Sequence, residues 1–303
     1  MQIEYREEPC RSALNRVKGM PFEWSLNPYM GCAHRCTFCY VRAFELRADR
    51  PADDRYGRSI RVKTNIAQVL ARELVRPAWL GAGIAIGAAT DPYQPCEGRY
   101  RLTRACLEVL GAAANPFSLI TRGPMIVRDL DVLQTATAQA ATRGAEVSVM
   151  FSIPTLDDEV WRTTEPGTAP PRQRLRALKE LVAGGVKASV GMAPILPGLS
   201  DRPEQLEAVV QAAREAGAAS IWANLLYLKP GTREHFLVAL AHDWPEELDR
   251  YEQLYDGRAY LPAEETQPVR DRVRALAREH GVRDRRPPQP EPPPQPEQLT
   301  LAV

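Results

Sequence analysis

Short runs of apolar and β-branched residues recur along the chain, and most precede a stretch with apolar residues at helical spacing. This alternation is typical of repeated β-α units around a parallel sheet, whose strands are apolar throughout because both faces are covered. The pattern predicts six strands, of which the first should precede or enter the loop 27–31. The others are expected at 83–88, 117–121, 147–151, 187–192 and 220–225.

Apolar stripes between the strands predict the intervening helices. Two begin near residues 66 and 130, and two clearer ones end at Gly184 and Gly217, since glycine favours helix ends. A later helix is expected from about Pro268 to His280. Six β-α units are too few for the closed eight-stranded barrel. We therefore expect an α/β fold, an open and partial TIM-like (β/α)6 barrel whose mouth lies at the carboxyl ends of the strands.

The carboxyl-terminal residues differ in composition from the rest of the chain. At 303 residues with 44% hydrophobic content, one main domain with one large core is the expectation. The composition changes from residue 283, and the run 287–296 is rich in proline and offers no residues for a core. We expect residues 1–282 to form the domain and residues 283–303 to form a disordered tail.

The balance of charge gives no sign of a polyanionic partner. The chain has 39 Lys and Arg against 38 Asp and Glu, so nucleic acid could bind only through a local basic patch. No apolar run approaches the roughly 18 residues that indicate a membrane span. The amino-terminal residues lack the apolar core of a signal peptide. We expect a cytoplasmic protein without membrane contact.

Three of the six cysteines lie together, as Cys32, Cys36 and Cys39. A tight group of thiols in a reducing compartment indicates metal or redox chemistry. A structural zinc ion would need a fourth ligand from elsewhere, because His34 lies too close between two of the cysteines to reach the same ion comfortably. A four-iron cluster ordinarily takes four thiolates, so three would leave one iron without a protein ligand.

The spacing Cys-x3-Cys-x2-Cys, with an aromatic residue before the last cysteine, resembles the cluster loop of radical S-adenosylmethionine (SAM) enzymes. In that superfamily SAM binds the open iron, and one electron from a [4Fe-4S] cluster cleaves it to a 5'-deoxyadenosyl radical. The radical abstracts hydrogen from a substrate. The resemblance implies this cluster, SAM, and a reductant such as flavodoxin or ferredoxin. It also implies that Phe38 and Tyr40 lie beside the adenine.

The stretch Thr90–Glu97 is similar to one in spore-photoproduct-lyase-like members of the superfamily. It follows the second predicted strand, at the end where barrel enzymes place their chemistry. Asp91 and Glu97 are candidates to hold the amino group of SAM or to contact substrate, and the alternative for each is a cap of the proline-rich turn. Related proteins hold the SAM carboxylate and ribose with a basic residue and a serine, here Arg122 and Ser152 after the third and fourth strands. Ala193, after the fifth, is a candidate backbone contact to adenine.

Glu165 and Arg174 match a further stretch of the family; their role stays open, and an acid and a base near one loop could form a structural ion pair. The resemblance covers about residues 20–240, which would be the core of a radical SAM domain spanning 1–282. The three cysteines outside the loop are expected to be inert buried thiols: Cys10, Cys96 and Cys106.

One departure from the family concerns the reaction. In photoproduct lyase a cysteine just after the second strand returns hydrogen to the thymine radical, whereas this chain has Ala88 and Ala89 there, and Cys96 lies beyond two prolines. We therefore expect SAM cleavage without repair of spore photoproduct. The substrate stays open among peptides, lipids, small metabolites and nucleic acid, and no catalytic residue is assigned. The alternatives are a non-catalytic iron-sulfur protein for electron transfer or sensing, and a zinc-stabilised binding module.

Overall fold

The computed structural model describes residues 3–284, and its larger sheet has eight strands in the order β11-β10-β9-β8-β7-β6-β3-β2. All neighbours from β3 to β11 are parallel, and only β2 pairs antiparallel with β3. The strands are β2 (Leu14–Arg16), β3 (Trp24–Leu26), β6 (Ile84–Ile86), β7 (Phe117–Thr121), β8 (Val147–Ser152), β9 (Ala188–Ile195), β10 (Ser220–Leu225) and β11 (Arg283–Asp284). Within the described residues β2 and β11 do not pair, so the expected open, partial barrel is confirmed.

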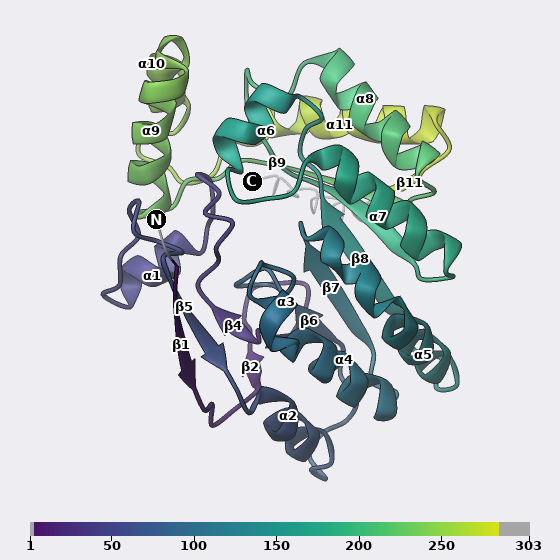
Figure 1. Ribbon diagram of the computed structural model, residues 1–303. Helices are drawn as coiled ribbons and strands as arrows, with labels where there is room; N and C mark the ends of the chain where they lie inside the picture. Colours follow the sequence, from purple (N-terminus) through teal and green to yellow (C-terminus); the bar gives the residue numbers. More distant parts are fainter. Residues whose placement is uncertain (1–2, 285–303) are drawn as a thin grey trace, which may run out of the picture.

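Helices alternate with the parallel strands, and Figure 1 shows α4, α5, α7 and α8 along the outer side of the curved sheet. The helices are α1 (Arg42–Arg47), α2 (Ile66–Leu74), α3 (Glu97–Tyr100), α4 (Leu102–Ala112), α5 (Leu130–Ala141), α6 (Asp158–Thr164), α7 (Pro171–Ala183), α8 (Pro203–Glu215), α9 (Thr232–Asp243), α10 (Leu248–Leu254) and α11 (Ala263–Glu279). Short 3-10 turns precede α5 and α10, at Pro124–Asp129 and Pro245–Glu247. In the described part of the chain, no helix combines the length and the apolar character that crossing a membrane requires.

The predicted strands agree with the observed ones to within a few residues. β7 and β10 have the predicted bounds, and β3 immediately precedes the loop where the weak first strand was expected. The predicted start of the last helix was wrong, because α11 begins at Ala263 and carries Pro268 inside it. Pro268 is the sixth residue of α11, beyond the amides that a helix start leaves unbonded, so the helix continues through it with one backbone hydrogen bond fewer.

The first two residues of the expected tail lie in a strand. Arg283 and Asp284 form β11, which pairs with Ser220 and Ile221 of β10. Sheet hydrogen bonding to a neighbour overrides the weak local pattern of a two-residue strand. The rest of the expected tail, residues 285–303, lies outside the described residues, so the tail and the domain boundary stay predictions.

A second, three-stranded sheet was not predicted from the sequence. Its order is β1 (Glu4–Glu8), β5 (Ser59–Lys63) and β4 (Tyr29–Met30). Tyr29, Ile60 and Val62 form its buried side, together with Cys96. β4 leads directly into the cysteine loop, so this sheet fixes the position at which the loop begins.

Candidate functional site

The cysteine loop lies between β4 and α1, with Cys32 and Cys36 buried and Cys39 half-buried. Burial raises the pKa of Cys36 to about 12, and the nearby Arg122 guanidinium offsets only part of this increase. Burial also raises the pKa of Cys32, and the charges of Asp91 and of the other two thiolates raise it further. Burial therefore disfavours the thiolate forms of Cys32 and Cys36 unless a positively charged partner such as a metal centre is bound.

The three thiols of the loop are the type of ligand that an iron-sulfur cluster takes. In residues 3–284, no three side chains of His, Cys, Asp or Glu are gathered as a single metal ion requires. A four-iron cluster needs a wider spacing, because each thiolate binds a different iron. Three thiols from one buried loop fit such a cluster with one iron left to another ligand.

Gln94 and Thr90 hold the first half of the cysteine loop. The amide oxygen of Gln94 accepts from the Ala33 backbone N–H at 3.0 Å. The Gln94 Nε2 group donates to the Gly31 carbonyl at 3.1 Å and to Thr90 Oγ1 at 2.9 Å. Thr90 Oγ1 itself donates to the Gly31 carbonyl at 2.7 Å. Gln94 is fully buried, so these bonds attach the loop after β6 firmly to the cysteine loop.

The segment after α6 holds the other side of the cysteine loop. The Thr37 N–H donates to the Thr164 carbonyl at 2.9 Å, and the Gly167 N–H donates to the His34 carbonyl at 3.1 Å. A Cβ atom on Gly167 would lie 2.5 Å from the Ala33 carbonyl oxygen. Only glycine therefore allows this close approach of the two backbones.

Asp91 joins the loop after β6 to the end of β7. Its Oδ1 accepts from Thr121 Oγ1 at 2.6 Å and from the Tyr93 N–H at 2.8 Å, and its Oδ2 accepts from the Arg122 N–H at 2.7 Å. His34 Nδ1 lies 3.3 Å from the same Oδ2. Burial would raise the pKa of Asp91, but His34 and these bonds lower it to about 2. Both oxygens have partners within the chain, and contact with SAM stays a prediction.

Glu165 and Arg174 do form an ion pair, and it includes Arg122 as well. Glu165 Oε2 lies 2.7 Å from Arg174 Nη2 and 3.0 Å from Arg122 Nε. Burial alone would raise the pKa of Glu165, but the two guanidinium groups hold it below its usual value. The other oxygen, Oε1, is buried without a hydrogen-bond partner among the described residues. The bond from Arg122 Nε to Glu165 Oε2 holds the Arg122 side chain in a fixed orientation.

Three residues predicted to contact SAM meet at one carbonyl group. The Ala193 carbonyl, on β9, accepts from Arg122 Nη2 at 3.2 Å and from Ser152 Oγ at 2.9 Å. Arg122 also lies over the ring of Phe38, with its Cζ 5.6 Å from the ring centroid. The ends of β7, β8 and β9 thus converge beside the cysteine loop. This convergence forms a polar site that contains the Arg122 guanidinium group.

Two further tyrosines, which were not predicted from the sequence, extend the ring contacts of Tyr40. The Tyr40 hydroxyl donates to the Ala88 carbonyl, and its ring centroid lies 6.0 Å from that of Tyr227. Tyr227 stacks in turn on Tyr260, with centroids 5.1 Å apart. A pattern of scattered tyrosines in loops carries no periodic signal, so only the fold reveals this row.

The remaining cysteines and Glu97 have structural roles, in packing or in hydrogen bonding. Cys96 and Cys106 are buried as predicted, and burial raises the pKa of Cys96 to about 12. Cys10 is half-buried against the main core, so the expectation of a buried thiol is met only in part there. Glu97 accepts from the Tyr29 hydroxyl and from the Thr103 N–H at the start of α4, so it caps that helix and links it to the small sheet.

Comparison with protein families gives a match to the Radical SAM superfamily over residues 26–211, more than half of the chain. The matched range includes all three clustered cysteines. The chain belongs to the radical SAM superfamily. Members of this superfamily use a [4Fe-4S] cluster and SAM, which are therefore the cofactors of this protein.

Similar proteins come from distant organisms. A relative from Mycobacterium tuberculosis is 36% identical over 293 residues, which cover 95% of this chain and 85% of the relative. A relative from Methanocaldococcus jannaschii is 24% identical over 200 residues, covering 66% and 71% of the two chains. Both are named as uncharacterized proteins.

Solved structures of spore photoproduct lyase share the fold of this radical SAM protein. A mutant lyase with bound AdoMet and dinucleoside spore photoproduct has a TM-score of 0.67 at 17% identity, covering 91% of this chain and 79% of that chain. A complex with the dinucleoside photoproduct gives a TM-score of 0.66 at 18% identity. At this level of identity the likeness concerns the fold alone.

Proposed function

We propose that this chain is a radical SAM enzyme that reductively cleaves SAM to a 5'-deoxyadenosyl radical, which abstracts hydrogen from a substrate other than spore photoproduct. The observation that carries the proposal is the cysteine loop, which is bonded to the Gln94 side chain after β6 and to backbone groups at and just after the end of α6. It lies beside three neighbouring strand ends whose polar groups converge on Ala193. A buried thiol loop without a nearby cosubstrate site would not need this arrangement.

The protein residues bind and orient the two cofactors. Cys32, Cys36 and Cys39 are the proposed ligands of the cluster, and SAM is the proposed ligand of the remaining iron. The bound cluster supplies the electron that breaks the sulfonium bond of SAM. The residues proposed to contact SAM are Phe38, Tyr40, Asp91, Arg122, Ser152 and Ala193.

Arg122 is the strongest of the proposed SAM contacts. Glu165 and the Ala193 carbonyl hold Nε and Nη2, and the side chain stays 20% exposed. A guanidinium held in this way is oriented in advance for a carboxylate, which lowers the entropy cost of binding. Ser152 lies on the neighbouring strand, at the position proposed for contact with the ribose.

Repair of spore photoproduct is not proposed, because this chain has alanines where the hydrogen-returning cysteine of that reaction is expected. Ala88 and Ala89 follow β6, and the Ala88 carbonyl is bonded to Tyr40. Cys96 lies instead in the separate apolar cluster beneath the small sheet, beside Tyr29. A thiol in that position is shielded from any substrate at the mouth of the barrel.

The proposed test is anaerobic reconstitution of the protein with iron and sulfide, followed by SAM and dithionite. We expect 5'-deoxyadenosine to form, and to be absent with Cys36→Ala, which removes one cluster ligand. A cytoplasmic flavodoxin or ferredoxin is the proposed physiological reductant and should replace dithionite. Formation of repaired thymine from synthetic spore photoproduct would contradict the second half of the proposal.

Two other outcomes would replace the proposal. An intact cluster that never yields deoxyadenosine would indicate a non-catalytic iron-sulfur protein for electron transfer or sensing. Zinc in stoichiometric amount without the absorbance of an iron-sulfur cluster would indicate a zinc-stabilised binding module.

A further inference from the structure

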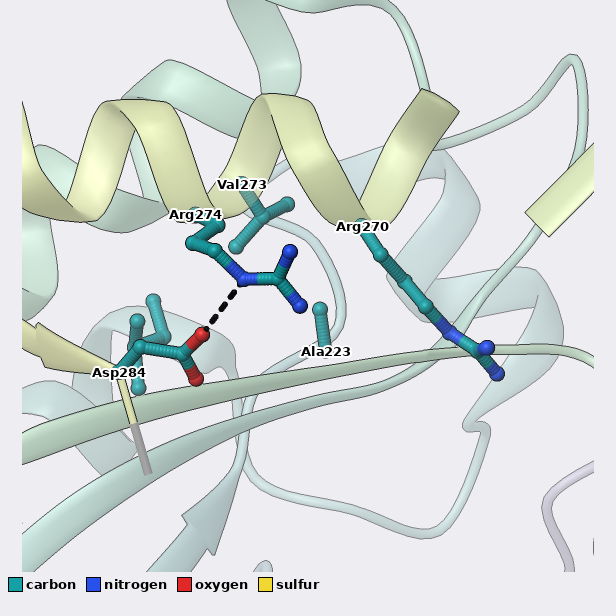
Figure 2. A pocket seen from close by; sticks show the side chains of 6 residues that line it. Ala223, Arg270, Val273, Arg274 and Asp284 are labelled. Atoms are coloured by element: carbon teal, nitrogen blue, oxygen red, sulfur yellow. Dashed lines mark hydrogen bonds and ion pairs between the residues drawn. The ribbon is translucent and has the colours of Figure 1, made fainter. Parts of the chain in front are cut away.

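Arg270, on α11, is held against β10 without a carboxylate partner. Its Nη2 donates to Asn224 Oδ1 at 2.9 Å, while its Nε is buried and has no hydrogen-bond partner within residues 3–284. Arg274, one turn further along the same helix, is by contrast bonded to Asp284 at 3.0 Å. Figure 2 shows Arg274 turned toward Asp284 and Arg270 extending away from that pair toward the strand. The charge of Arg270 is therefore left without a counter-ion in the described part of the chain.

The side chain of Arg270 reaches past the edge of β10. Together with Val273 it lines a narrow cavity against Ala223, on the side of the sheet that α11 covers. Asn224 follows Ala223 in the strand, so its side chain points to the opposite face, which is the inside of the partial barrel. β11 covers β10 only at Ser220 and Ile221, and this leaves the edge beside Asn224 unpaired among the described residues. The guanidinium group passes at this edge.

The Asn224–Arg270 pair lies one strand away from the proposed SAM contacts. The pairing of β10 with β9 shifts register between Ala223 and Leu225, which face Met192 and Ile195. Asn224 is thus opposite the additional residue that β9 contains at 193–194. The Ala193 carbonyl is the group that Arg122 and Ser152 share. The unpaired cation is therefore placed next to the SAM site rather than at a remote surface.

We propose that Arg270 and Asn224 bind an anionic group, a carboxylate or a phosphate, of the substrate of the radical reaction. The inference rests on the proposed function and adds the chemical class of the substrate. A partly buried cation without a counter-ion is unfavourable, and a bound oxyanion would remove this cost through charge-assisted hydrogen bonds. Asn224 accepts from Arg270 through Oδ1, so its Nδ2 group remains a second donor to the anion. Lys229, over the ring of Tyr260, adds positive charge after the same strand.

Calorimetric titration of the reconstituted full-length protein tests the proposal without the unknown substrate. Inorganic phosphate and acetate are the two probes, and stronger binding of one identifies the kind of anion. We expect an anion site whose dissociation constant rises at least about tenfold in Arg270→Gln, because a charged hydrogen bond is lost; binding at Arg122 would not change in this variant. Arg272→Gln is the matched control, since Arg272 is an exposed arginine on the same helix. Its anion affinity should equal that of the wild type.

A second variant keeps the test decisive if Arg270→Gln folds poorly. Asn224→Asp supplies an internal carboxylate beside Arg270, so the fold should persist and the bound anion should be lost. The proposal is overturned if neither probe binds the wild type, or if Asn224→Asp binds phosphate and acetate as the wild type does. The titrations contain no SAM and no reductant, so their failure is distinguishable from a failure of SAM cleavage.

Discussion

Replacing Gln94 with alanine removes the main attachment between the cysteine loop and the segment after β6. The Ala33 N–H would lose its acceptor and stay buried, which costs about 1–3 kcal/mol. The Gly31 carbonyl would lose one donor but keep the bond from the Thr90 hydroxyl, so the free-energy cost at this carbonyl is smaller. The truncated side chain also leaves a cavity at a fully buried position. Together these effects predict a local destabilisation of about 2–4 kcal/mol.

Hydrogen exchange on the protein without its cluster measures this effect directly. The protection of the Ala33 amide should fall by roughly 30-fold or more in Gln94→Ala, since about 1.4 kcal/mol corresponds to a factor of ten. Gln139→Ala is the matched control, because Gln139 is exposed on α5 and its replacement should change protection little. Equal protection of Ala33 in the wild type and in Gln94→Ala would refute the structural reasoning.

Three further predictions concern the same loop and its supports. Glu165→Leu leaves two arginines without their buried carboxylate and should lower the free energy of unfolding by about 3–5 kcal/mol in urea titrations; an unchanged midpoint would argue against the buried ion pair. Gly167→Ala should displace the Ala33 carbonyl and reduce the iron bound per chain after reconstitution, whereas full iron content would show that the backbones can separate. Because the pKa of Asp91 is about 2 when folded and higher when unfolded, its contribution is complete above about pH 4 and is lost as the pH falls toward 2. Asp91→Asn should remove about 2 kcal/mol of the stability that is lost on acidification. Curves of unfolding free energy against pH with the same shape for the wild type and Asp91→Asn would contradict this.

The sequence predicted the parts of the fold that local patterns determine. Strands such as β7 and β10 are covered on both faces, so their apolar runs are continuous and their bounds follow directly. The small sheet was missed because β1, with the sequence EYREE, is mostly exposed and β4 has only two residues. Their pairing depends on contacts between distant segments, which no local pattern contains.

The candidate site also has residues that the sequence reveals and contacts that only the folded chain reveals. The cysteines are readable because all three lie within eight residues, and the resemblance supplied the strand-end residues. Gln94 was part of the recognised stretch, yet its function as a support depends on a contact with Ala33 across 61 positions. The contact between Asn224 and Arg270 spans 46 positions and carries no motif. Such long-range bonds become visible only when the chain is folded.

The central claim is that the protein leaves one iron of its cluster for SAM. Electron-nuclear double resonance on the reduced, reconstituted protein tests it most directly, with SAM labelled by 15N at the amino group and 17O at the carboxylate. The account predicts that both labels couple to the cluster, and that both couplings disappear when SAM is omitted. A cluster with no coupling to either label, or with a fourth protein ligand on that iron, would contradict it.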